Sequence, residues 1–244
     1  MFARPLYASL TLLSALCLSQ LALAGEPLVA SDAVPGSLSA NTSVTSDYFF
    51  RGLSQTGGLP AIQGGLDYAL SLAAPVELYA GVWSSNVRFS QATLEADLYA
   101  GLRGAVGAFS WDLGAYAYLY PGAAASLAYD FFEGALGLGY DLGFASFSLS
   151  ANYSPNNFGA SGQALYTRLG LEAPLGDRLT LSAGVGYQTI EDNAAFGTPD
   201  YLDYSVGLGA TLVGVDAALS FQGAAIEGCA SGCQGLVFSL SKSL

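Results

Sequence analysis

The segment 145–154 alternates strictly between apolar and polar residues and reads Ala-Ser-Phe-Ser-Leu-Ser-Ala-Asn-Tyr-Ser. Successive side chains of a β-strand point to opposite faces, so Phe147 and Leu149 share one face, and Ser148 and Ser150 share the other. Similar alternating segments recur along the rest of the chain. A chain made of many strands with one apolar and one polar face has few folds open to it, because every apolar face must leave water.

Residues 1–24 have the features of a cleaved signal peptide. Arg4 supplies the positive charge, residues 6–21 supply the apolar run, and Ala-Leu-Ala at 22–24 supplies a small-residue cleavage site. A transmembrane anchor is the alternative, but the apolar run is short and is interrupted by polar residues. Leu16 is too large to precede a lipidated cysteine at Cys17, so we do not expect a lipoprotein. The sequence therefore predicts export.

The composition excludes several classes of protein. The chain has 19 acidic residues against 7 basic ones, which argues against binding to nucleic acid, because phosphates require Lys and Arg. Hydrophobic residues make up 52% and charged residues only 11%, whereas a soluble domain has about 25% charged residues. After residue 24, no apolar run reaches the ~18 residues of a membrane helix. Contact with lipid would therefore require strands, which cross a bilayer only as a closed barrel.

The alternation predicts an all-β fold, a transmembrane antiparallel up-and-down β-barrel of about twelve strands. An even number of strands places both chain ends on the periplasmic side of an outer membrane. We expect residues 25–36 to form a periplasmic segment and residues 37–244 to form the barrel. The predicted strands are 37–54, 60–70, 76–84, 92–103, 108–120, 127–140, 144–154, 163–173, 178–188, 201–212, 214–222 and 234–244.

The predicted connections alternate in length, as expected for a barrel with short periplasmic turns and longer external loops. The first external join, near 56–59, is an exception and is predicted to be short. The longer joins are 85–91, 121–126, 155–162, 189–200 and 223–233, and the tight ones are 104–107, 141–143, 174–177 and 213–214.

The two faces of the predicted strands have different chemistry. The apolar faces carry no charge in their middles, where a cation would cost ~2–4 kcal/mol. The opposite faces hold Ser, Thr, Tyr, charged residues and many glycines, which either relieve crowding in a narrow barrel or keep its lumen open. The candidate pore-lining residues are Asp47, Arg51, Asp67, Glu95, Asp97, Arg103, Asp112, Tyr116, Tyr118, Arg168, Glu172, Asp203 and Asp216.

Acids outnumber bases on these inward faces, which predicts a channel for small solutes with a weak preference for cations. Some charges are expected to pair across strands, and Arg103 with Asp112, across the 104–107 hairpin, is one candidate pair. Glu95 and Asp97 lie two residues apart on one face. A general acid/base pair is a possible interpretation of these two carboxylates, but solvated pore charges are the simpler one.

The chain contains no histidine, so catalytic dyads and triads that use His as the base are excluded. The glycines lead into no helix that would cradle a phosphate. We expect no catalytic residues, no metal site and no cofactor. Cys229 and Cys233 lie in the last predicted external loop. In an exported chain a local disulfide is the expected state, and two free thiols are the alternative.

Residues 44–55, Val-Thr-Ser-Asp-Tyr-Phe-Phe-Arg-Gly-Leu-Ser-Gln, followed by Pro-Ala-Ile-Gln-Gly-Gly-Leu-Asp-Tyr at 60–68, resemble the TorF family of porins. Residues 79–87 and 237–244 fit the same pattern, so the resemblance spans nearly the whole exported chain. It departs at the cysteine loop and at Leu244, where family members usually end in Phe, and this weakens a terminal assembly signal. The resemblance implies an outer-membrane barrel with pore function and no catalytic residues. Its expected partners are outer-membrane lipid, the barrel-assembly machinery and small solutes.

Two other functions remain open from the sequence. A non-conducting barrel would have a structural role or would bind a partner through its external loops, although these loops are short for an adhesin. A soluble exported β-sandwich also has alternating strands. The low charge, the uncharged apolar faces and the alternating connection lengths argue against the sandwich.

Overall fold

The structure is a computed structural model that describes residues 29–31, 34–229 and 231–244. The predicted signal peptide at 1–24 lies outside the described residues. No helix within the described ranges is long and apolar enough to span a membrane.

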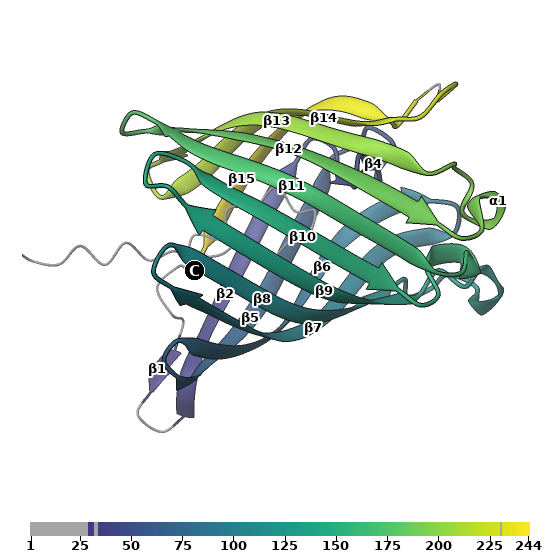
Figure 1. Ribbon diagram of the computed structural model, residues 1–244. Coiled ribbons are helices and arrows are strands. Elements are labelled where there is room, and N and C mark those ends of the chain that lie inside the picture. Colours follow the sequence, from purple (N-terminus) through teal and green to yellow (C-terminus); the bar gives the residue numbers. More distant parts are fainter. Residues whose placement is uncertain (1–28, 32–33, 230) are drawn as a thin grey trace, which may run out of the picture.

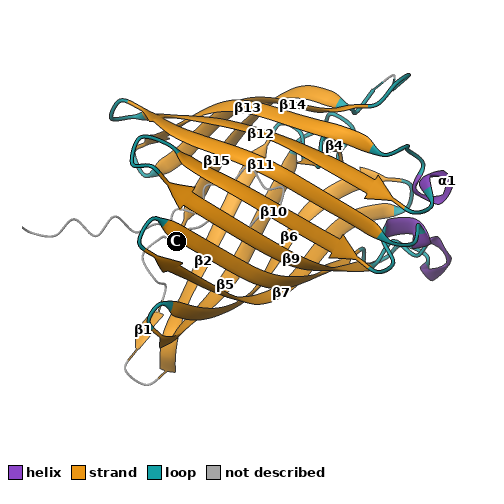
Figure 2. Ribbon diagram, in the orientation of Figure 1, coloured by secondary structure: helices purple, strands orange, loops and turns teal. Residues whose placement is uncertain are grey.

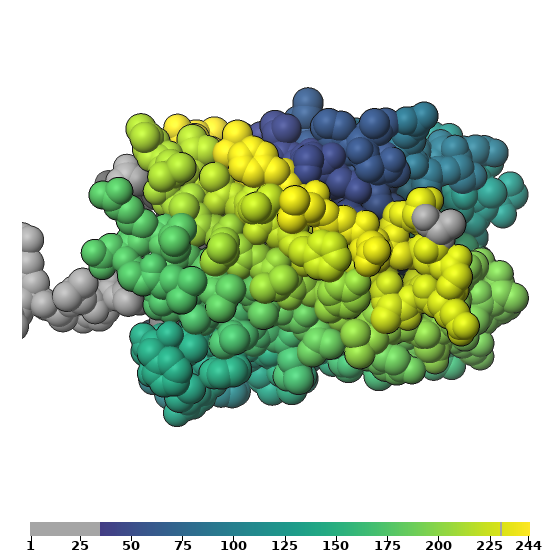
Figure 3. Space-filling model, turned by 90° about the horizontal axis from the view of Figure 1, so that it is seen from above, coloured from purple at the N-terminus to yellow at the C-terminus, as the bar shows by residue number. Residues whose placement is uncertain are grey.

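Twelve strands form one closed antiparallel barrel, so the predicted fold class is confirmed (Figures 1 and 2). Each strand pairs with the next in sequence, and the last strand pairs with the first through neighbours such as Ser241 and Ser43. In the space-filling view, the yellow C-terminal strand lies against the purple N-terminal segment (Figure 3). The barrel strands are β2 (Val34–Thr45), β5 (Ala61–Ala73), β6 (Val76–Phe89), β7 (Ala92–Val106), β8 (Phe109–Leu119), β9 (Phe131–Asp141), β10 (Ser146–Ser154), β11 (Ala164–Leu175), β12 (Leu179–Ile190), β13 (Tyr201–Leu212), β14 (Val215–Ala225) and β15 (Gln234–Ser243).

The two ends of the barrel differ, and we name them the turn end and the loop end. The turn end holds the short connections and the C-terminus (Figure 1). The loop end holds most of the longer connections, with three short helices and a small two-stranded hairpin. These elements are η1 (Ala125–Leu127), η2 (Phe158–Ala160), α1 (Asn193–Phe196), β3 (Phe49–Phe50) and β4 (Leu53–Ser54); β1 (Val29–Ser31) pairs with the first part of β2.

Three predicted boundaries are wrong. The strand predicted at 37–54 ends at Thr45, and the join that follows is long rather than short. The join predicted at 85–91 is only two residues long, because β6 continues to Phe89 and a positive φ of 47° at Ser90 turns the chain directly into β7. The strand predicted from 127 begins at Phe131, since residues 125–127 form a 3-10 turn.

The outer wall of the barrel is apolar. On β10, for example, Phe147 is 47% exposed, and Leu149 and Tyr153 are exposed to the same degree, whereas Ser154 on the opposite face is fully buried. The same alternation exposes Leu, Val, Ile and Phe along every barrel strand. Because these side chains cover the outside of a closed barrel, the surface matches the lipid-facing band of a transmembrane barrel.

The lumen is accessible from the turn end and closed at the loop end. Along β10 the inward side chains of Ser146 and Ser148 are exposed, while those of Ser150, Asn152 and Ser154 are buried. The neighbouring strand β11 has the same gradient, from buried residues near Ala164 to accessible ones toward Leu175. The barrel therefore encloses a space that opens at one end and is blocked at the other.

Candidate pore and its plug

Residues 46–59, which we call the plug, fold from the end of β2 into the lumen. Tyr48, Phe49 and Arg51 are all buried. Tyr48 reaches β7, while Arg51 reaches β9 and β12. One short segment contacts such separate parts of the wall at once only from inside the barrel. The plug forms its own two-stranded sheet, β3–β4, and adds no strand to the wall.

Turn chemistry explains why the predicted strand ends early. Arg51 and Gly52 have positive φ values of 48° and 78°, which reverse the chain between β3 and β4. Alternation also stops at Phe49 and Phe50, two adjacent aromatic residues. Asp47 holds the base of the plug by accepting hydrogen bonds of 2.7 Å from the side chains of Ser54 and Thr56.

A buried ion pair fixes the tip of the plug to the wall. Arg51 Nη2 lies 2.6 Å from Glu133 Oε2, and the two side chains are only 5% and 1% exposed. Arg51 Nη1 donates to Gln188 Oε1 at 2.9 Å. The guanidinium also lies 4.3 Å from the ring centroid of Tyr166 and 4.7 Å from that of Phe50, within the range of cation–π attraction.

Glu133 has further polar neighbours. Tyr118 and Asn152 donate to Glu133 Oε2 at 3.3 and 3.4 Å, which are long distances for such bonds. Arg51 is therefore the main partner of this buried carboxylate. Tyr118 itself stacks on Phe131, with ring centroids 4.4 Å apart.

A second set of contacts holds the start of the plug. The Tyr48 hydroxyl donates to Glu95 Oε1 at 2.7 Å, and its ring packs edge-on against Trp83. Burial, together with the Glu95 and Asp97 carboxylates, raises the pKa of the Tyr48 hydroxyl well above its ordinary value. Tyr48 thus stays protonated and remains a donor. The Arg88 amide fixes the far side of the plug by donating to the Gln55 carbonyl at 2.7 Å.

Aromatic side chains from the loops cover the plug. Tyr129 and Phe158 stack with ring centroids 4.4 Å apart, and Phe89, Tyr120 and Phe196 pack around them. Tyr120 and Tyr129 come from the connection before β9, Phe158 from the connection before β11, Phe196 from α1, and Phe89 from the end of β6. The loop end is therefore closed by two layers, the aromatic cover outside and the plug inside.

Tyrosine rings explain two of the glycines on the inward faces, Gly81 and Gly101. A Cβ atom on Gly81 would lie 2.5 Å from the ring of Tyr99, and one on Gly101 would lie 2.5 Å from the Tyr79 hydroxyl. Both distances are too short for atoms that are not bonded. Glycine is needed at these positions because rings from neighbouring strands fill the space, so relief of crowding accounts for them.

The three inward arginines are all paired with carboxylates. Besides Arg51, Arg168 Nη1 lies 2.6 Å from Asp203 Oδ1, and Arg103 Nε donates to Glu77 at 2.6 Å. The predicted Arg103–Asp112 contact is not the one formed. Those residues face each other in register, but Glu77 takes the guanidinium from the opposite strand.

Several predicted acids have neutral partners instead. Asp112 accepts from Tyr79 at 2.9 Å, and Asp67 accepts from Tyr99 at 2.5 Å. Asp216 accepts from Thr211 near the turn end. The remaining predicted residues lie on inward faces: Asp97, Tyr116 and Tyr118 are buried, and Glu172 is half-buried.

Glu133 and Gln188, the two wall residues that bind the tip of the plug, are not among the predicted pore-lining residues. Glu133 alternates with the outward-facing Phe132 on β9, so strand periodicity would have placed it inward. Gln188 on β12 is uncharged and gave no comparable signal.

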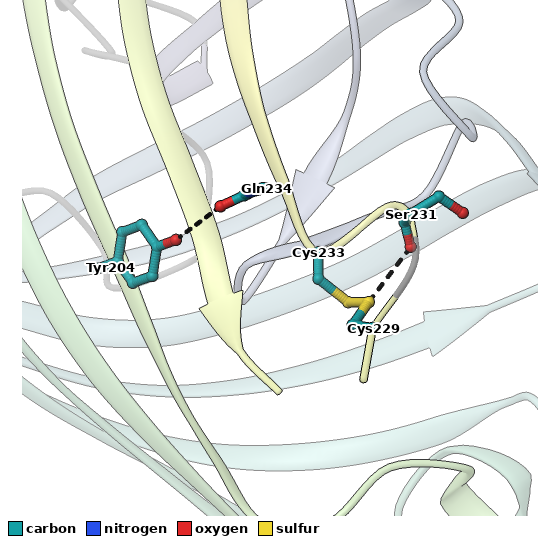
Figure 4. Close-up of a disulfide and its surroundings, with 5 residues drawn as sticks. All are labelled: Tyr204, Cys229, Ser231, Cys233 and Gln234. Carbon is teal, nitrogen blue, oxygen red and sulfur yellow. Dashed lines mark hydrogen bonds between the residues drawn. A yellow bond between two sulfur atoms is a disulfide. The ribbon is translucent and has the colours of Figure 1, made fainter. Parts of the chain in front are cut away.

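Cys229 and Cys233 are joined by a disulfide in the connection between β14 and β15, with their Cα atoms 6.3 Å apart (Figure 4). The Cys229 sulfur contacts the Ser231 carbonyl, and Tyr204 on β13 donates to Gln234 just beyond the bridge (Figure 4). No group of three or more Asp, Glu or Cys side chains in the described part of the chain is arranged to hold a metal ion.

These features define a class of protein, a transmembrane β-barrel of the outer-membrane type with a segment folded into its lumen. The chain belongs to the Gcw_chp family, described as bacterial protein of unknown function, whose model matches residues 29–237. No curated protein sequence matches the chain.

Solved structures share the fold at low sequence identity. An outer membrane channel from Pseudomonas putida F1 is 12% identical, with a TM-score of 0.54 over 86% of this chain and 95% of that chain. A chain solved in work on the in-meso crystallization of membrane proteins is 11% identical, with a TM-score of 0.53 over 85% of this chain and 83% of that one. At such identities the likeness shows the fold alone.

Proposed function

We propose that the protein is an outer-membrane channel for small solutes, held closed at its loop end in the conformation described. One observation carries the proposal: the segment that blocks the lumen is not part of the wall. Because β3 and β4 pair only with each other, the plug would leave without breaking the pairing between any two barrel strands. A lumen filled only by wall side chains would offer no such route.

Other observations support the location and the class. The exposed apolar wall suits outer-membrane lipid, and the pattern of residues 1–24 suits export and assembly by the barrel machinery. The resemblance to the TorF porins and the fold shared with the Pseudomonas putida channel point to transport rather than catalysis. Short turns at the C-terminal end support a periplasmic turn end and an external loop end.

The pairing of the inward charges favours cations. Each of the three inward arginines is neutralised by a carboxylate, whereas Asp67 and Asp112 accept hydrogen bonds from neutral tyrosine hydroxyls of the wall. The surplus charge along the path is therefore negative, and a negatively lined pore prefers cations.

Conductance in planar bilayers tests the proposal. We compare the wild type with a variant in which residues 49–58 are replaced by a short Gly-Ser join. A variant in which the mostly exposed residues 121–126, in the connection before β9, are replaced by a Gly-Ser join serves as the matched control, because it leaves the residues of the aromatic cover in place. The plug variant should conduct far more often than the other two proteins, and its reversal potential under a salt gradient should indicate cation preference. A plug variant that folds, as judged by heat-modifiable migration on a gel, but does not conduct would overturn the proposal.

The aromatic cover favours a second candidate. Tyr129 and Phe158 stack at the loop end and belong to the loops rather than to the plug, as expected of a non-conducting barrel that presents its loops to a partner. Failure of the plug variant to conduct would favour this candidate.

A further inference from the structure

We infer that the Cys229–Cys233 disulfide is a redox-sensitive clasp on the plug, which an external dithiol opens. The inference rests on the proposed channel function only for its effect on conductance. The clasp itself concerns the attachment of residues 46–59 to the connection between β14 and β15.

The first observation is a direct hydrogen bond between the two segments. The Ser54 amide in the plug donates to the carbonyl of Gly232 at 2.8 Å. Gly232 lies inside the disulfide ring, next to Cys233. The bridge therefore fixes the position of an acceptor that the plug uses.

The second observation is close backbone packing on the same side. A Cβ atom on Gly52 would lie 2.6 Å from the Gly223 carbonyl oxygen, and one on Gly223 would lie 2.5 Å from the Cys233 carbonyl oxygen. The Cys233 carbonyl also accepts from the Ala224 amide at 2.7 Å. The backbones of the plug, the end of β14 and the disulfide ring are thus stacked in direct contact.

The third observation is that other residues of the plug pack against the hairpin formed by β14 and β15. The ring of Phe49 lies against Gly235, just after the disulfide. Leu53 packs against the cluster that contains Ala224 and Ile226. One side of the plug is held by this hairpin, while Arg51 and Tyr48 hold the other sides.

The disulfide is placed where a reductant reaches it. Cys229 is exposed, and the connection lies at the loop end. A dithiol would reduce it by two exchange steps: one thiolate attacks a sulfur of the bridge and forms a mixed disulfide, and the second thiol of the reagent displaces the protein sulfur. Two protein thiols and one oxidised, cyclic reagent result, so two electrons and two protons pass from the reagent to the protein.

Hydrogen exchange measures the clasp without any need for conductance. The full protein in detergent or nanodiscs is compared as oxidised, after dithiothreitol, and as the Cys229→Ser/Cys233→Ser variant with and without dithiothreitol. No other described residue is a cysteine, and Cys17 lies in the predicted signal peptide. Amides of 46–59 should exchange faster by up to about thirtyfold after reduction, which is the factor that the chain-entropy relation gives for a disulfide ring this small. Amides of β10 should not change.

The outcomes separate the clasp from the channel. The serine variant should exchange like the reduced protein and should not respond to dithiothreitol. Equal exchange of 46–59 in the oxidised and reduced protein would overturn the clasp, whatever the conductance. Faster exchange with a matching rise in open probability supports both proposals. Faster exchange in a barrel that never conducts, even with the plug removed, supports the clasp and overturns the channel.

Discussion

Replacing Arg51 by Met should release the plug. The change keeps most of the volume of the side chain but leaves Glu133 buried without its ion-pair partner. Breaking a buried pair from one side typically costs about 3–5 kcal/mol. The remaining donors, Tyr118 and Asn152, lie at 3.3 and 3.4 Å from the carboxylate and compensate for little of this loss.

The loss falls on the plug rather than on the wall. Wall strands are held by their own continuous pairing, whereas the plug is held by separate contacts, one of which is the buried Arg51–Glu133 ion pair. A change of 3–5 kcal/mol alters the ratio of open to closed forms by about 10²- to 10⁴-fold. Open probability in planar bilayers should rise accordingly, and heat-modifiable migration should remain that of a folded barrel.

A double-mutant cycle tests the reason for the effect. Glu133→Gln removes the carboxylate charge that Arg51→Met leaves without a partner. The double variant should therefore be less open than Arg51→Met alone. Arg103→Met is the matched control, since Arg103 and Glu77 are 39% and 33% exposed and exposed pairs contribute little. An Arg51→Met channel that stays closed, or a double variant as open as the single one, would refute the reasoning.

Three further predictions concern the wall and the lumen. Val185→Arg should destabilise the membrane-inserted barrel by about 2–4 kcal/mol because this 41% exposed side chain faces lipid. Ser148→Arg, in the accessible lumen, should assemble normally. Equal yields of folded barrel from the two variants on heat-modifiability gels would contradict the assigned faces. Gly81→Ala should lower the free energy of unfolding by about 1–3 kcal/mol, because the added Cβ atom overlaps a tyrosine ring. A Cβ atom on Gly209 would lie 3.9 Å from its nearest neighbour, so Gly209→Ala should leave the free energy of unfolding in urea unchanged. Glu172→Gln should shift the reversal potential of the plug-deleted channel toward zero; an unchanged potential would remove this carboxylate from the conduction path.

The wall strands were predictable because residues close together in the sequence determine which face of a strand each side chain occupies. A strand in a membrane barrel meets lipid on one face and the lumen on the other, so the period of two is written into each segment. The period of two places Phe147 and Val185 on the apolar face of their strands from neighbours within a few residues, and both are exposed in the structure. Boundaries were less reliable, since a strand extends as far as its partner allows, as β6 does to Phe89.

The plug was not predictable because its position depends on contacts with residues far away in the sequence. The residues up to Thr45 continue the pattern of a wall strand, and nothing local indicates that the residues after them turn into the lumen. The segment turns inward because Arg51 finds Glu133, 82 residues further along the chain, and Gln188, 137 residues further. The adjacent Phe49 and Phe50 and the glycines that follow break the period, but by themselves they indicate only that the strand ends.

The plug links the closing of the lumen to its charge. Arg51 is one of three inward arginines, and it is the one that the wall does not carry. When the plug leaves, this positive charge leaves with it, and Glu133 becomes an additional carboxylate on the wall without an ionic partner. Residues 49–58 carry no charge other than Arg51, while Asp47 lies only two residues beyond the end of β2 and stays beside the wall. A lumen that residues 49–58 have left is therefore more negative than the closed one by the charge of one arginine, so opening and cation preference should increase together. A pore closed by an uncharged segment would become wider on opening without becoming more negative. Comparing the ion selectivity of Arg51→Met with that of the plug deletion separates the effect of charge from the effect of width. Both variants lack the arginine, but only the deletion widens the lumen permanently.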